Sequence, residues 1–132
     1  MARRLILDTG VLVAQERGRA LDAIAADDDV AIATVTLGEL WTGVHLADDE
    51  QRAARRRAFV EGIRDRVPLL PYDEEVAAAH GILLAHVHSA GKPRGAHDLI
   101  IAATAVATRR TLVTTDLSAR FSALPEVRVL EL

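Results

Sequence analysis

The sequence predicts an α/β protein with three layers, α/β/α, and a mostly parallel central sheet, forming a single domain over residues 1–132. Short apolar runs alternate along the chain with longer segments whose apolar residues recur at helical spacing. This alternation is typical of parallel sheets that are covered by helices on both faces. A length of 132 residues suits one domain. Only four residues are aromatic, so the core is expected to consist of Val, Leu, Ile and Ala.

Five short segments predict the strands. Leu5-Ile6-Leu7 is apolar and ends at Asp8-Thr9-Gly10, which is typical of a buried strand followed by a turn. Pro68 has no backbone N–H, so the third segment is expected to form a short strand at most. The expected strands are residues 5–7, 30–33, 67–70, 111–114 and 127–130.

Six further segments predict helices. Thr36 and Glu39 fit a capping box, in which Thr36 is the N-cap of a helix that continues through Val44. Asp73 starts the clearest helix, and Gly91 stops it. The other expected helices are residues 11–16, 19–26, 49–66 and 98–108.

The composition excludes several classes of function. The chain has no cysteine, which rules out disulfides, thiolate zinc sites and cysteine nucleophiles. No apolar run is long enough to span a membrane. The first apolar stretch is interrupted by Asp8 and is too short for a signal peptide, so we expect a soluble cytoplasmic protein. A net charge of −3 neither indicates nor excludes binding to nucleic acid.

Four acidic residues from distant segments are expected to meet at one edge of the sheet. Asp8 and Asp116 follow predicted strands, and the ligands of such sheets bind outside the carboxyl ends of the strands. Glu39 and Asp98 lie in the first turn of predicted helices, which start at the same edge. We therefore predict that the carboxyl oxygens of these four residues converge on one pocket.

Each of these acids also has a purely structural interpretation. Asp8 and Asp116 fit helix caps, Glu39 fits the capping box, and Asp98 fits the positive end of a helix dipole. Their apolar neighbours favour a functional site, because a single acid among core residues is half buried and gathered carboxylates repel one another. The acids of the predicted surface occur instead in clusters, at residues 27–29, 48–50 and 73–75.

A hard divalent cation would stabilise such a group of carboxylates. Ligands that are all oxygen suit Mg²⁺, with Mn²⁺ as the alternative. A bound Mg²⁺ lowers the pKa of a water molecule and neutralises charge on a phosphate. No other nucleophile or base is evident near these positions, so the sequence predicts hydrolysis of phosphodiesters by water, with all four acids both catalytic and metal-binding.

The same segments resemble the PIN-domain ribonucleases, and more narrowly the VapC-type toxins of toxin–antitoxin pairs. The resemblance extends from residue 5 to about residue 129 and is carried by Asp8-Thr9, by Glu39 and by residues 97–105 and 112–116. It implies an α/β/α fold, Mg²⁺-dependent cleavage of RNA, homodimers and inhibition by a partner antitoxin protein.

Within this resemblance, Asp8, Glu39, Asp98 and Asp116 match the metal-binding acids of the family one for one. Its supporting polar residues match Thr9 and Thr114. Many members carry another acidic or amide residue two places after the last acid, where this chain has Ser118. The resemblance therefore implies that a second metal ion is held more weakly, or only with substrate bound.

Residues near Asp98 are candidates for contact with RNA. Arg94 and Lys92 lie in a predicted loop beside the proposed site, and His97 either orients Asp98 or touches RNA. A second basic group has acids within helical pairing distance, which favours a solvated, salt-bridged helix face. That group is Arg52, Arg55, Arg56 and Arg57.

The helix that carries Glu39 also has an apolar face. Its residues fit either the core or an exposed groove for an antitoxin helix, and the sequence leaves both interpretations open. They are Leu37, Leu40, Trp41 and Val44.

Three other functions share features with this sequence. Asp8-Thr9-Gly10 is also the local motif of aspartic proteases, but those are all-β and this chain has strong helical periodicity. A receiver-like signalling module that binds Mg²⁺ without catalysis needs an acidic pair after the first strand, and Asp8 stands alone. A PIN-like RNA-binding module without activity is disfavoured because all four acids are present.

Overall fold

The computed structural model describes residues 2–19 and 22–132, and its central element is a five-stranded sheet in the order β3-β2-β1-β4-β5. All four pairs of neighbouring strands are parallel, which confirms the predicted class and sheet. The third strand is short, as expected from Pro68, and the last begins two residues later than predicted. The strands are β1 Arg4–Leu7, β2 Asp29–Ala33, β3 Leu69–Leu70, β4 Thr111–Thr114 and β5 Val129–Glu131.

β1 lies at the centre of the sheet. Leu5 pairs with Val30 of β2 on one side and with Thr111 of β4 on the other. With strands on both sides and helices on both faces, this strand is shielded from water, which explains its run of three buried apolar residues. Asp8, the next residue, is thereby placed over the middle of the carboxyl edge of the sheet.

In the part of the chain that the structure describes, five helices and two short 3₁₀ turns connect the strands. Asp49 and Asp73 cap their helices by accepting from the N–H groups of Arg52 at 2.7 Å and Val76 at 3.0 Å. Gly91 ends its helix in the left-handed conformation, with φ 65°, as predicted. The elements are α1 Thr9–Glu16, α2 Thr34–His45, α3 Glu50–Arg66, α4 Glu74–Ala90, α5 Ala96–Thr108, η1 Leu117–Ala119 and η2 Phe121–Ala123.

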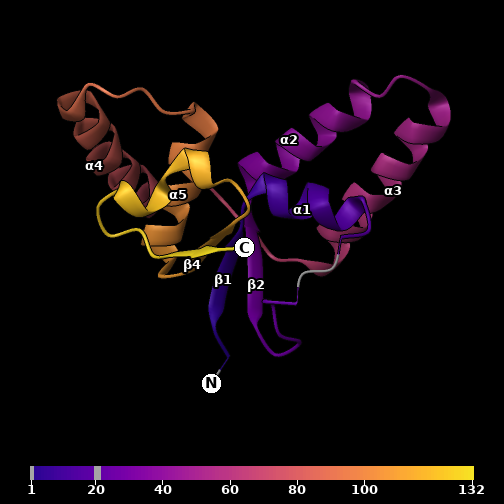
Figure 1. The fold of residues 1–132 in the computed structure, drawn as a ribbon, viewed down its shortest axis with the longest axis horizontal. Coiled ribbons are helices and arrows are strands. Elements are labelled where there is room, and N and C mark those ends of the chain that lie inside the picture. The colour runs from indigo at the N-terminus through magenta and orange to yellow at the C-terminus, as the bar shows by residue number, and fades with distance from the viewer. Residues whose placement is uncertain (1, 20–21) are drawn as a thin grey trace.

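The helices cover both faces of the sheet (Figure 1). α4 and α5 pack with Ile6 and Leu112 in one apolar core, and α1, α2 and α3 pack with Leu5, Leu7 and Val113 in the other. Successive strand residues therefore alternate between the two faces, as the pleat of a strand requires. This arrangement confirms the predicted three layers. Within residues 2–19 and 22–132, no helix has the length and apolar character needed to cross a membrane.

The helix predicted over residues 19–26 is wrong where that segment is described, and its residues 20 and 21 lie outside the described part of the chain. Residues 22–24 form turns and a bend. Asp28 closes this segment, because its carboxylate accepts from the N–H of Ala25 at 2.7 Å and from Nη2 of Arg3 at 2.6 Å. These hydrogen bonds give the N–H of Ala25 and the side chains of Asp28 and Arg3 their partners without a helix.

The capping box predicted at Thr36 is also wrong. α2 begins at Thr34, directly after β2, and has no side-chain hydrogen bond at its N-cap. Thr36 lies inside the first turn and is fully buried, and its hydroxyl has no hydrogen-bond partner among the described residues. Glu39 consequently lies in the second turn of α2 rather than the first. α1 and α5 each begin two residues earlier than predicted.

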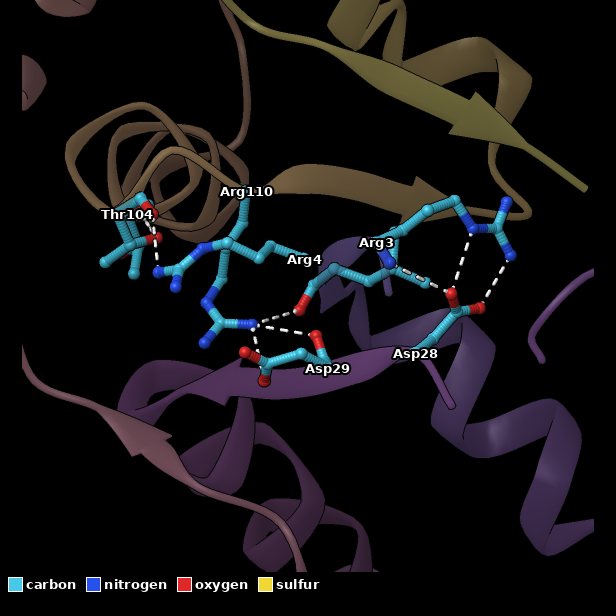
Figure 2. Close-up of polar contacts among 8 residues, drawn as sticks. Arg3, Arg4, Asp28, Asp29, Thr104 and Arg110 are labelled. Carbon is cyan, nitrogen blue, oxygen red and sulfur yellow. Dashed lines mark hydrogen bonds and ion pairs between the residues drawn. The ribbon is translucent and has the colours of Figure 1, made fainter. Parts of the chain in front are cut away.

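Arginine side chains join the amino ends of the strands (Figure 2). Arg110, which is 8% exposed, donates from Nη1 to the carbonyl of Leu5 at 3.1 Å. The same atom donates to the carbonyl of Asp29 at 2.9 Å and to its carboxylate at 3.2 Å. β1, β2 and the start of β4 are thus tied together at the edge opposite Asp8.

We expect Thr36→Val to leave the free energy of unfolding unchanged or to raise it by about 1 kcal/mol, because it removes a buried hydroxyl that has no partner. The same substitution at Thr104, whose hydroxyl donates to the carbonyl of Ile100 at 2.7 Å, is expected to lower it by about 1 kcal/mol. Urea unfolding of both variants measures the two changes. If Thr36→Val lowers the free energy of unfolding by about 1 kcal/mol, the Thr36 hydroxyl stabilises the helix start as a cap does, which would contradict this account.

Candidate metal centre

Asp8 is the fixed centre of the site. It is 6% exposed, follows β1 directly and caps α1. Its N–H donates to the carbonyl of Val113 in β4 at 2.9 Å, which continues the ladder between the two strands. Its carboxylate accepts from the N–H of Thr9 at 2.8 Å and from the hydroxyl of Thr114 at 2.9 Å. The structural interpretation as a cap therefore holds, and the two threonines that the family resemblance singled out both contact this acid.

Thr9 also brings Glu39 to the site. The Thr9 hydroxyl donates to Oε1 of Glu39 at 2.7 Å, while the Thr9 N–H donates to Asp8. The second carboxylate oxygen of Glu39, Oε2, lies 3.5 Å from Nδ1 of His97 in α5. Glu39 is thus held between the start of α1 and the start of α5. His97 contacts Glu39, and it also acts electrostatically on the neighbouring Asp98, whose pKa it lowers against the larger effect of burial.

Asp98 lies in the first turn of α5, as predicted. The absence of a side chain at Gly95 matters here, because a Cβ at that position would lie 3.1 Å from Oδ2 of Asp98. A larger residue at position 95 would therefore push against the carboxylate. The positive end of the α5 dipole favours the charged form of Asp98.

Asp116 lies two residues beyond β4 and is exposed. Its N–H donates to the hydroxyl oxygen of Thr114 at 2.9 Å, so Thr114 links Asp8 and Asp116. Its Oδ1 accepts from the hydroxyl of Ser118 at 2.5 Å and from the N–H groups of Ser118 and Ala119 at 3.0 and 3.2 Å. Asp116 is therefore also the N-cap of η1, which agrees with its interpretation as a helix cap.

The carboxylates of the site repel one another. Burial raises the pKa of Asp8, and the charges of Glu39 and Asp116 raise it further, against the hydrogen bonds that Asp8 accepts. Burial likewise raises the pKa of Asp98, followed by the negative charges of the other three acids. The hydrogen bond from Ser118 is the main cause that lowers the pKa of Asp116. The fold thus brings four acids from distant segments within electrostatic reach of one another.

This set of donors suits a hard divalent cation. All four are carboxylates, which Mg²⁺ and Mn²⁺ prefer, and a cation among them would offset the repulsion that raises the pKa of Asp8 and Asp98. In the described part of the chain, however, no three His, Asp or Glu side chains form a group that can hold a metal ion as they stand. Asp8, Glu39 and Asp116 each give an oxygen to a protein hydroxyl instead. The carboxylates thus share one edge of the sheet, and joint coordination requires side-chain rotation.

The loop before α5 carries the other two residues predicted to contact RNA. Arg94 donates from Nη1 to the carbonyl of Ala119 and thereby fastens this loop to η1. Lys92 is exposed and lines a groove together with Arg94. Arg94 therefore has a structural contact that the sequence did not indicate.

Three of the four basic residues singled out in α3, Arg52, Arg56 and Arg57, have partners within the protein. Arg52 pairs with Asp48 at 3.1 Å, and Arg56 donates to a backbone carbonyl of α2 at 2.7 Å. The guanidinium carbon of Arg57 lies 5.3 Å from the centroid of the Trp41 ring. These contacts support the interpretation of this helix face as solvated and salt-bridged.

The apolar face of α2 divides into two parts. Leu40 and Val44 are 8% and 3% exposed and belong to the core beside Val60 of α3. Of the two interpretations that the sequence left open, the core interpretation fits these two residues, because α3 covers them. Leu37 and Trp41 are half buried and pack at the margin of the same core.

A groove lies between α1, α2 and α3. The sequence left a groove on the apolar face of α2 open as one interpretation but did not indicate that α1 and α3 form its other walls. The groove has a volume of about 190 Å³, and its apolar lining includes Val13, Leu40 and Phe59. Its charged lining residues are Glu16, Arg17, Glu39 and Arg56. Helical periodicity shows which faces are apolar but not where three packed helices leave a gap. The groove connects this side of the molecule to Glu39 of the site.

Comparison with known proteins gives the family. The PIN domain family model matches residues 5–126. Ribonuclease VapC from Rickettsia bellii (strain RML369-C) is 31% identical over 127 residues, which cover 96% of this chain and 94% of that protein. Ribonuclease VapC5 from Mycobacterium tuberculosis is 37% identical over 111 residues, which cover 84% and 82%.

Solved structures agree with this. VapBC-5 from Mycobacterium tuberculosis, a member of the VapBC family of toxin–antitoxin systems, matches with a TM-score of 0.82 at 31% identity over 98% of both chains. VapBC2 from Rickettsia felis, bound to a promoter DNA fragment, matches in fold with a TM-score of 0.85 at 21% identity over 98% of both chains. The chain therefore belongs to the PIN-domain family and, within it, to the VapC ribonucleases, as the motifs around Asp8 and Asp98 indicated.

We expect Asp98→Asn to raise the melting temperature of the metal-free protein at neutral pH, because it removes one charge from a repelling group. A raised pKa means that the folded protein binds more protons than the unfolded chain between about pH 4 and the raised value. Wild-type stability therefore falls as the pH rises through this window. Thermal melts in EDTA, from about pH 4 to about pH 7, should show a difference between variant and wild type that grows with pH.

Asp73→Asn is the matched control. It makes the same change of charge at the N-cap of α4, where asparagine caps about as well as aspartate. We expect its melting temperature to stay close to that of the wild type, without the pH trend of Asp98→Asn. An Asp98→Asn variant that melts below the wild type at neutral pH would contradict the repulsion.

Proposed function

We propose that this chain is a Mg²⁺-dependent endoribonuclease that acts as the toxin of a toxin–antitoxin pair. The observation that carries the proposal is the gathering of four carboxylates at the carboxyl edge of the sheet, where the charges of the other acids act on buried Asp8 and half-buried Asp98. Relatives named as ribonucleases, one of them a tRNA(fMet)-specific endonuclease from Salmonella typhimurium, support RNA as the substrate. The acids are Asp8, Glu39, Asp98 and Asp116.

In the proposed site these four acids hold the cation, with Mn²⁺ as the alternative to Mg²⁺. When bound, Mg²⁺ would lower the pKa of a water molecule and neutralise charge on the phosphate that is cut. Thr114 and Thr9 orient Asp8 through two hydrogen bonds, and Thr9 also orients Glu39. Partners of this kind fix the direction in which a ligand presents its free lone pairs.

We propose that residues at the start of α5 contact the RNA. His97 is exposed beside Glu39 and so lies next to the acids. Nη1 of Arg94 donates a hydrogen bond to the carbonyl of Ala119. The other N–H groups of the guanidinium remain available to bind a phosphate. Lys92 adds an exposed positive charge in the same loop.

We propose an antitoxin protein as the partner, because the similar structures from Mycobacterium tuberculosis and Salmonella typhimurium are VapBC assemblies. The groove between α1, α2 and α3 offers an apolar surface, to which Leu40 contributes only the floor. Leu37 and Trp41 lie on the same helix and are accessible in part. A partner segment in this groove would cover Glu39 and thereby interfere with cleavage.

The alternative is a PIN-like module that binds RNA without cutting it. The finding that favours it is that no three metal-ligating side chains of the described residues form a group that can hold an ion as they stand. The two functions differ in cleavage, so one assay separates them. The receiver-like alternative has no support from the comparisons.

We expect the wild-type protein to cleave total cellular RNA in Mg²⁺ and not in EDTA. Asp8→Asn and Asp98→Asn should each lower the cleavage rate at least about a hundredfold, since even the loss of a residue that only orients a metal ligand costs about ten- to a hundredfold. Mg²⁺ should also raise the melting temperature of the wild type more than that of either variant, because only the wild type has the full set of ligands. Gel electrophoresis of the RNA and thermal melts measure both effects.

Asp73→Asn again serves as the control, since it is expected to cleave like the wild type and to gain the same stability from Mg²⁺. Site variants that still cut RNA but melt lower without metal would return Asp8 and Asp98 to a purely structural role. Wild-type protein that binds RNA but never cuts it would establish the alternative.

We also expect a homodimer in solution and a larger assembly with the antitoxin. The family resemblance motivates this expectation, together with the high apolar fraction of the chain, 50%. Light scattering at tens of micromolar, on the scale of ordinary dissociation constants, measures the mass of the protein with and without its partner. A monomer at that concentration would contradict the homodimer.

A further inference from the structure

A groove lined by positive charges lies beside the acids, between the end of α4, the loop before α5 and η1. Its volume is about 360 Å³, and its polar lining comes from His86, Lys92, Arg94, Ser118 and Arg120. No acidic residue of the described part of the chain lines it. Three positive charges thus gather in one groove of a chain whose net charge is −3.

One contact joins the groove to the site, and a second joins the two walls of the groove to each other. Ser118 lines the groove and also donates its hydroxyl to Asp116 at 2.5 Å. Arg94 donates to the carbonyl of Ala119, which fastens one wall of the groove to the other. An extended ligand that occupies the groove would therefore pass directly into the group of acids.

Arg120 is placed in this groove by a fixed backbone. It adopts the left-handed conformation, with φ 49° and ψ 46°, which is uncommon for a residue other than glycine. Its N–H donates to the carbonyl of Leu117 at 3.3 Å, and its carbonyl accepts from the N–H of Ala123 at 3.0 Å. Hydrogen bonds on both sides thus hold the two 3₁₀ turns, and the exposed side chain extends from a rigid corner.

A structural explanation accounts for only part of this charge. The carboxyl end of α4 carries a partial negative charge, which favours His86 and Lys92 near it whatever the function. It does not account for Arg120, which comes from a different segment about 30 positions later in the chain. Charges converging from two segments on one groove indicate an anionic ligand.

We infer that this groove binds the backbone phosphates of the RNA strand on one side of the bond that is cut, with Lys92 and Arg120 as the principal contacts and His86 at the margin. This inference rests on the proposed function. Phosphates are the anions of the proposed substrate, and contacts to them position a nucleic acid without reading its sequence. Arg94 then has two tasks, which are to add charge and to hold the two walls together.

The test measures binding separately from cleavage. Lys92→Ala and Arg120→Asn, alone and together, are made in the Asp98→Asn protein, and asparagine is chosen because it tolerates the left-handed conformation. A fluorescein-labelled oligouridine of 16 nucleotides is the probe, since phosphate contacts do not depend on sequence. Fluorescence anisotropy gives the Kd at several salt concentrations.

Each substitution is expected to raise the Kd about fivefold at 0.1 M salt and to reduce the slope of log K against log salt by about 0.7, which is the contribution of one phosphate contact in a single strand. The double variant should lose about 25-fold. Arg64→Ala is the matched control, because Arg64 is exposed on α3, away from α4 and α5, and its pairing with Asp65 at 3.4 Å is exposed as well (Figure 1). Its Kd and salt slope should equal those of the parent protein.

Variants that melt like the parent but match Arg64→Ala in Kd and salt slope would overturn the inference. Cleavage by the wild type, assayed separately, keeps the two questions apart. If the wild-type protein cuts RNA while the groove variants bind RNA normally, only the inference that the groove binds RNA phosphates is contradicted. Wild-type protein that cuts no RNA contradicts the proposed function, whatever the binding data show.

Discussion

Mutual repulsion among the carboxylates at the carboxyl edge of the sheet is the constraint on which the rest of the structure depends. Asp8 cannot move away from it, because β1 is the central strand and both of its neighbours fix its position. Burial of this acid costs stability. Two features of the fold offset this cost in stability. They are the apolar cores on both faces of the sheet and the hydrogen bonds of Arg110 at the opposite edge.

Hydrogen bonds connect three of the four acids, Asp8, Glu39 and Asp116, into one network. Thr114 links Asp8 to Asp116, while Thr9 links Asp8 to Glu39. Segments from three parts of the chain are thereby held together, and each of these acids keeps part of its hydrogen-bonding capacity for a ligand. The surroundings are asymmetric, since a cationic groove meets the site on the side of η1 and an apolar groove meets it at Glu39. This asymmetry gives the proposed RNA and the proposed antitoxin different approaches to one centre.

Local patterns in the sequence predicted the strands, the layers and the place of the four acids at one edge of the sheet, because strand ends and apolar neighbours depend on nearby residues. Whether these acids bind a metal ion stays a prediction. Thr36 was misassigned because β2 runs directly into α2, and only the paired sheet reveals this. The helix expected over residues 19–26 does not form where that segment is described. Asp28, which lies just after it, accepts hydrogen bonds from Ala25 and from Arg3 and so stabilises a turn instead. The role of Arg120 was not predictable, since it depends on two segments that meet only in the folded chain.

The most direct test of the central claim is a Mn²⁺ soak of crystals of the wild-type protein, measured by anomalous diffraction. Mn²⁺ is chemically close to Mg²⁺ as an oxygen-seeking cation and gives an anomalous signal. We predict an anomalous peak among the carboxyl oxygens of Asp8, Asp98 and Asp116, with Glu39 in reach and with the side chains rotated toward it. A peak elsewhere with none among these acids, or no peak at a Mn²⁺ concentration that supports RNA cleavage, would contradict the account.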